Sequence, residues 1–84
     1  MITRVTLAID ELQAIQLKAF GRSLLITLRH DLVSLPMIDL RTTLNRRIVS
    51  LDFDLAAQSV EKATRIVSIA IEGWPVEIIS VEER

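Results

Sequence analysis

Apolar and polar residues alternate from the start of the chain. Over residues 2–9, Val5, Leu7 and Ile9 fall on one side of an extended chain, and the residues between them fall on the other. A period of two in a segment rich in β-branched residues is typical of a half-buried strand. We therefore expect the first strand here, ending at Asp10.

A short helix is expected next, over residues 12–20, where apolar residues recur at helical spacing. Asp10 and Gln13 form a capping-box pair at its start. Gly21 stands where a left-handed C-cap residue would end it. A strand over the same residues stays an alternative, because several of them also alternate.

The second strand is expected over residues 22–29, where Leu24, Ile26 and Leu28 would share one face. The connection that follows, over residues 30–45, is longer than a hairpin turn requires.

Two alternatives stay open for this connection. Pro36 suits the first turn of a helix, and Met37, Leu40 and Leu44 would then line one helical face. An inserted helix over residues 36–45 is one alternative, and a functional loop is the other.

The second half of the chain predicts a strand and then a long helix. Residues 46–53 alternate, with Val49, Leu51 and Phe53 directed inward, and Asp54 is expected to cap the helix. That helix has an apolar stripe at a period of about 3.6 residues. The stripe consists of Ala56, Val60, Ala63, Val67, Ala70 and Ile71.

Gly73 is expected to end this helix, and Pro75 prevents its continuation. The last strand is expected over Val76–Val81. Strict alternation would place Ile78 on one face of that strand and Val81 on the other, so both faces would be apolar.

The order strand, helix, strand, strand, helix, strand is that of a ferredoxin-like two-layer sandwich. We therefore expect a single α+β domain over residues 1–84, with a four-stranded antiparallel sheet and two helices on one of its faces. Apolar residues assigned to the other face, such as Ala8, Leu25 and Ile48, would require cover. The fold is shared by many unrelated functions and does not assign one.

The chain is short for the apolar content that it carries. It has 84 residues, of which 50% are apolar, and its mean hydropathy is +0.39. A domain of this size cannot bury that much apolar surface alone, so we expect a homo-oligomer, with a dimer as the default. Trp74, Ile79 and Val81 are the candidate interface residues.

Charge and composition narrow the range of partners. The net charge is −1 and the sequence pI is about 5.7, which argues against nucleic acid and anionic membranes as partners. Cysteine is absent, so disulfides and thiol catalysis are excluded, and no apolar run approaches the length of a membrane span. The first residues lack the layout of a signal peptide, and we expect a cytoplasmic protein with no cofactor or metal.

Two small groups of polar residues are candidates for a catalytic or metal site. His30 has Asp31 beside it, but adjacent strand positions face opposite ways, so the carboxylate is badly placed to orient the ring. Asp52 and Asp54 share one side of a strand, yet two carboxylates are too few for a metal site. The lack of a catalytic group, together with the apolar surplus and the two apolar faces of the last strand, favours a non-enzymatic protein-interaction, assembly or regulatory module.

An alternative function rests on arginine. Arg41, Arg46 and Arg47 form a local basic cluster with hydroxyl and amide residues between them. A guanidinium presents a planar fork that suits phosphate or carboxylate groups. The alternative is therefore a small-ligand or anion-binding domain, with or without catalysis, or a surface for an acidic protein partner.

Overall fold

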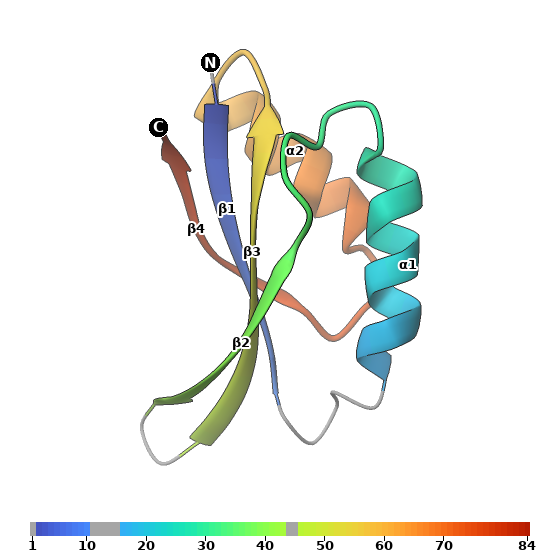
Figure 1. Ribbon diagram of the computed structural model, residues 1–84, viewed down its shortest axis with the longest axis vertical. Helices are drawn as coiled ribbons and strands as arrows, with labels where there is room; N and C mark the ends of the chain where they lie inside the picture. The colour runs from blue at the N-terminus through green and yellow to red at the C-terminus, as the bar shows by residue number, and fades with distance from the viewer. Residues whose placement is uncertain (1, 11–15, 44–45) are drawn as a thin grey trace.

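Within the part of the chain that the structure describes, backbone hydrogen bonding defines four strands and two helices, arranged in two layers (Figure 1). The computed structural model describes residues 2–10, 16–43 and 46–84. The elements are β1 (Ile2–Asp10), α1 (Leu17–Leu28), β2 (Met37–Thr43), β3 (Arg46–Ala56), α2 (Val60–Ala70) and β4 (Glu77–Glu83).

The strands form one antiparallel sheet in the order β2-β3-β1-β4. Both helices lie on the same side of this sheet, and β2 and β4 are its two edges (Figure 1). This arrangement is the predicted ferredoxin-like sandwich, so the fold class is confirmed.

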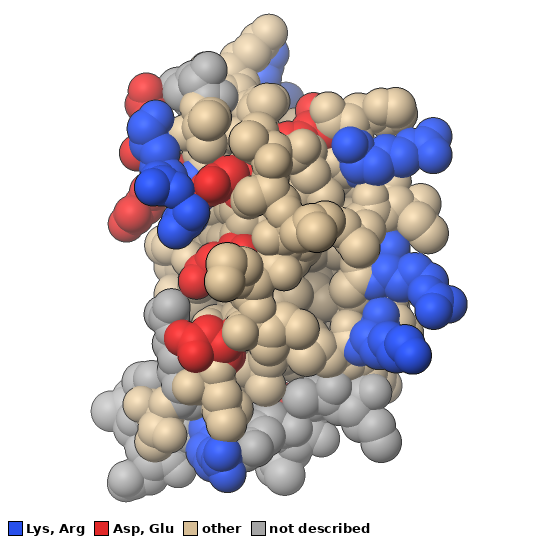
Figure 2. All heavy atoms as spheres, in the orientation of Figure 1, with Lys and Arg blue, Asp and Glu red and all other residues tan. Residues whose placement is uncertain are grey.

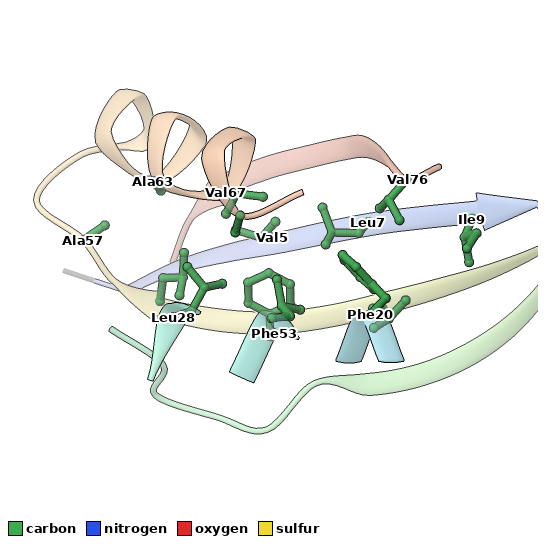
Figure 3. Close-up of a cluster of buried hydrophobic side chains, with 14 of the residues drawn as sticks. Val5, Leu7, Ile9, Phe20, Leu28, Phe53, Ala57, Ala63, Val67 and Val76 are labelled. Carbon is green, nitrogen blue, oxygen red and sulfur yellow. The ribbon is translucent and has the colours of Figure 1, made fainter. Parts of the chain in front are cut away.

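The core lies between the sheet and the helices. The central strands supply matched pairs, because Val5 lies opposite Phe53 and Leu7 opposite Leu51, and all four are buried. Figure 3 shows Val5, Leu7 and Phe53 among side chains from both helices. The helical contribution comes from Phe20, Leu24 and Leu28 of α1 and from Ala63, Val67 and Ala70 of α2.

The predicted second strand is wrong, because residues 22–29 belong largely to α1. Leu24 and Leu28 are buried at a spacing of four, whereas Ile26 points away from the core and is 63% exposed. Gly21 lies inside the helix and does not end it. The predicted helix over 12–20 is therefore too early; its residues 12–15, with Gln13 of the capping box, lie outside the described part of the chain.

The second strand is β2, where a helix or a loop was expected. It pairs with β3 along its whole length, from Met37 opposite Asp52 to Thr43 opposite Arg46. Pro36 precedes this strand and begins no helix. The segment before it is tied to β3 as well, since the Asp54 N–H donates to the Ser34 hydroxyl at 3.1 Å.

Asp54 is not a helix cap, because β3 continues to Ala56. Ser59 caps α2, with its hydroxyl accepting a hydrogen bond from the Lys62 N–H at 3.1 Å. Helix α2 ends at Ala70, and Gly73 lies in the turn that follows, where its φ of 84° is a left-handed conformation that favours glycine.

A β-bulge changes the expected faces of β4. Val81 lies opposite Val5, but Ile78 lies opposite Leu7, so Ile79 is an extra residue in the ladder. Ile78 and Val81 therefore both pack against the core, although strict alternation had placed them on opposite faces.

Candidate interaction surface

Large apolar side chains are exposed along β2 and beside it. Leu35 is 74% exposed, and Ile38 is 63% exposed although it lies opposite the buried Leu51. The exposed apolar residues of α1, β2 and the segment between them include Leu25, Leu35, Met37, Ile38 and Leu40. We call these five residues the β2-edge patch.

An apolar groove of about 260 Å³ lies between α1 and β2, and three residues of the β2-edge patch line it: Leu25, Leu35 and Ile38. Its wall includes Leu17, Gly21 and Leu25 from the helix and Ile38 from the strand. Helix α1 directs Phe20, Leu24 and Leu28 into the core, which leaves the neighbouring Leu25 on the side of the groove. The second strand is thus apolar on the side of the helical layer, yet that layer does not cover it.

The two edges of the sheet differ in ways that matter for pairing with another strand. In β4 a bulge interrupts the ladder, and Glu77, Glu82 and Glu83 add charge. Bulges and charged side chains are common devices that prevent edge-to-edge association. In β2 the register with β3 is continuous, so this edge lacks a bulge, and its two charged residues, Asp39 and Arg41, are of opposite sign and stand among apolar residues.

The face of the sheet away from the helices is mainly polar. Leu25 was assigned to it but lies on α1, Ala8 is buried, and Ile48 is partly buried. In Figure 2, Asp and Glu side chains gather over the sheet, while Lys and Arg side chains stand in a row along α1. Alternation and register place Arg4, Thr6, Ser50, Asp52, Asp54 and Glu82 on this face.

An ion pair joins β1 to β3 on the polar face. Arg4 lies directly opposite Asp54, and its Nε and Nη2 atoms donate to the two carboxylate oxygens at 3.0 and 3.2 Å. Arg84 adds a third hydrogen bond, from Nη1 to Oδ2, at 3.4 Å. Hydrogen bonding to Arg4 lowers the pKa of Asp54 below its ordinary value, and Asp54 raises the pKa of Arg4. The pair between Arg4 and Asp54 is therefore a structural contact that joins β1 to β3.

His30 follows the end of α1 and is exposed. Its Nε2 accepts a hydrogen bond from the Nε of Arg29 at 3.3 Å. Among residues 2–10, 16–43 and 46–84, no group of three or more His, Cys, Asp or Glu side chains is placed to hold a metal ion. Neither of the described helices is long and apolar enough to cross a membrane.

The three arginines of the predicted anion site lie where β2 meets β3. Arg41 is opposite Ile48, Thr42 is opposite Arg47, and Arg46 is opposite Thr43. Consecutive positions of a strand belong to opposite faces of a sheet, so the positions of Arg46 and Arg47 fall on different faces. Anion binding by this cluster stays a prediction.

The three predicted interface residues lie in different surroundings. Trp74 is partly buried and makes an edge-on contact with Phe20, with ring centroids 5.4 Å apart. Val81 packs against the core, and Ile79, the extra residue of the bulge, is 56% exposed. Their role in an interface stays a prediction.

The sequence analysis missed the β2-edge patch, although a signal for it was present. Residues 37–40 alternate as Met, Ile, Asp and Leu, which is a strand pattern. Pro36 also suits the first turn of a helix, and this alternative obscures the strand pattern that follows it. Comparison of the chain with protein-family models, with curated proteins and with solved structures finds no match.

Proposed function

We propose that this protein is a non-enzymatic interaction module that acts as a homo-oligomer, with a dimer as the default. The observation that carries the proposal is the β2-edge patch, where an uninterrupted edge strand and an apolar groove lie side by side. Burying apolar surface contributes roughly 25 cal/mol per Å², so covering the patch favours association.

The ion pair between Arg4 and Asp54 is not tuned for acid–base catalysis. A general acid or base requires a pKa tuned toward the working pH by its surroundings. The shifts of Arg4 and Asp54 instead move each group further into its charged form, because the two side chains pair with each other. An ion pair of this kind stabilises strand pairing.

The proposal is tested by measuring mass in solution and by changing the patch. Light scattering at micromolar concentration should return about twice the chain mass of 9.5 kDa. Leu35→Lys adds a charge to the groove and should shift the mass toward that of the monomer. Ile69→Lys is the matched control, because Ile69 is 65% exposed on α2 and lies outside the groove, and it should leave the mass unchanged.

A mass of one chain at every concentration tested would refute the proposal. If Leu35→Lys leaves a stable oligomer intact, the interface does not include the groove. Circular dichroism of both variants checks that each one is folded.

A further inference from the structure

We propose that two copies of this chain join through their β2 strands, antiparallel and with Leu40 on a two-fold axis, so that the two sheets continue as one. This inference rests on the proposed function and specifies the geometry of the assembly. It is carried by the backbone of the edge strand and by the order of charges along it.

The backbone of β2 offers an open edge. One side of the strand is bonded to β3 from Met37 to Thr43 without a break in register. The N–H and C=O groups on the outer side of such a strand form a template for another strand. The opposite edge, β4, carries the bulge at Ile79 and three glutamates, which makes it a poor template.

A second copy is the occupant that the order of charges favours. Asp39, Leu40 and Arg41 are consecutive, so opposite charges stand on either side of an apolar residue. In an antiparallel pair centred on Leu40, position 39 of each copy lies opposite position 41 of the other. Two pairs of opposite charge then form across the interface, and such cross-strand pairs are stabilising.

The neighbouring registers are disfavoured by the same charges. Centring the pair on Asp39 would place two carboxylates directly opposite each other, and centring it on Arg41 would oppose two guanidinium groups. Like charges in these positions destabilise a strand pair. The sequence of β2 therefore specifies the register as well as the edge.

The apolar residues of β2 agree with this register. Leu40 lies opposite the buried Val49, and Ile38 lies opposite the buried Leu51, so both belong to the side of the sheet that faces the helices. Leu40, which is 49% exposed, would meet Leu40 of the second copy. The grooves of the two copies would then lie on the same side of the continuous sheet.

Disulfide trapping tests the edge and the register together, because the chain has no cysteine of its own. Directly opposed Cβ atoms of an antiparallel pair are about 4.5–5.5 Å apart, close to the span of a disulfide. Leu40→Cys should therefore oxidise rapidly to a covalent dimer. Thr42→Cys is the control on the same strand, since its two copies would be four residues out of register, about 13 Å apart.

Ile79→Cys is the control on the other edge and should also stay uncrosslinked. Faster crosslinking through Thr42→Cys would overturn the register, and faster crosslinking through Ile79→Cys would overturn the choice of edge. A protein with the mass of a dimer in which Leu40→Cys does not crosslink would overturn this inference and leave the proposed function standing. A monomeric mass at all concentrations would overturn both.

Charge reversal gives an independent test without crosslinking. Asp39→Arg and Arg41→Asp should each raise the dimer dissociation constant by roughly tenfold or more, since two pairs of opposite charge become pairs of like charge. An equimolar mixture of the two variants should form a heterodimer, because both cross-strand pairs are then opposite in charge again. If the variants dimerise as well alone as when mixed, these charges do not set the register.

A foreign extended segment is the other conceivable occupant of the β2 edge. In that case, the free protein would have the mass of a monomer, and Leu40→Cys would not form a covalent homodimer. That result would contradict the two-fold assembly.

Discussion

Asp54 links three parts of the chain, because it accepts hydrogen bonds from Arg4 on β1 and from Arg84 near the C-terminus. The sequence predicted it as a helix cap, since an aspartate between a strand and a helix is a common N-cap. A single sequence does not reveal that Arg4 is its cross-strand neighbour, which follows from the register of β1 and β3.

The pH dependence of stability should report this ion pair. The pKa of Asp54 is lowered in the folded protein, so the pair stabilises the fold above the ordinary pKa of the carboxyl group and is lost as pH falls through the lowered value. The midpoint of urea unfolding should therefore be lower for Asp54→Asn than for the unmodified protein near neutral pH. The difference should close below about pH 4.

Glu72→Gln provides the control for this experiment, because Glu72 is exposed at the end of α2. It should change the unfolding midpoint little at either pH. A difference for Asp54→Asn that persists unchanged into acid would contradict a role for the carboxylate charge.

At the scale of elements, the stripe predicted for α2 is confirmed at Ala63, Val67 and Ala70, whereas Ala56 belongs to β3 and Val60 is exposed. Val67 is fully buried against the sheet, so Val67→Asp would bury an unpaired carboxylate in the hydrophobic core. The expected loss is about 3 kcal/mol or more of unfolding free energy, a large part of the stability of a small domain. Thermal unfolding followed by circular dichroism measures it.

Ile69→Asp is the matched control on the same helix, because Ile69 is 65% exposed. It should cost well under 1 kcal/mol, as most surface substitutions do. Equal losses for the two variants would mean that α2 does not bury the face that contains Val67.

The other elements show where periodicity alone misleads. Leu24, Leu25 and Ile26 are consecutive apolar residues, so they satisfy a period of two and a helical period at once. The burial of Phe20, Leu24 and Leu28 settles the matter in favour of a helix. The bulge at Ile79 could not be predicted, because a bulge is defined by the partner strand.

The order of elements was nevertheless predictable. Two errors offset each other, since a strand was assigned to the α1 segment and the true second strand fell in the connection after it. The strongest patterns, in β1, β3 and α2, supplied the layers of the sandwich. The β2-edge patch could not be predicted, because the exposure of Ile38 and Leu40 depends on how much of the sheet α1 covers.

At the scale of the whole molecule, the proposed dimer should make thermal stability depend on concentration. Association with the native state raises the melting temperature as total protein increases. A hundredfold dilution should therefore lower Tm measurably for the unmodified protein. For Leu35→Lys, which is expected to weaken the proposed interface, Tm should start lower and change little on dilution.

A melting temperature that is independent of concentration for the unmodified protein, together with the mass of a monomer, would contradict the dimer. Ile69→Lys serves again as the control and should melt with the same concentration dependence as the unmodified protein.

The bulge in β4 has a consequence for the size that an assembly can reach. A sheet has two lateral ends, and growth into a fibre requires both of them to accept new strands. Here one end is irregular and acidic around Ile79, while the other is consumed when two β2 strands meet. The stoichiometry of the proposed dimer would therefore be self-limiting: addition would stop at two copies, because the strand that joins them would leave no site for a third.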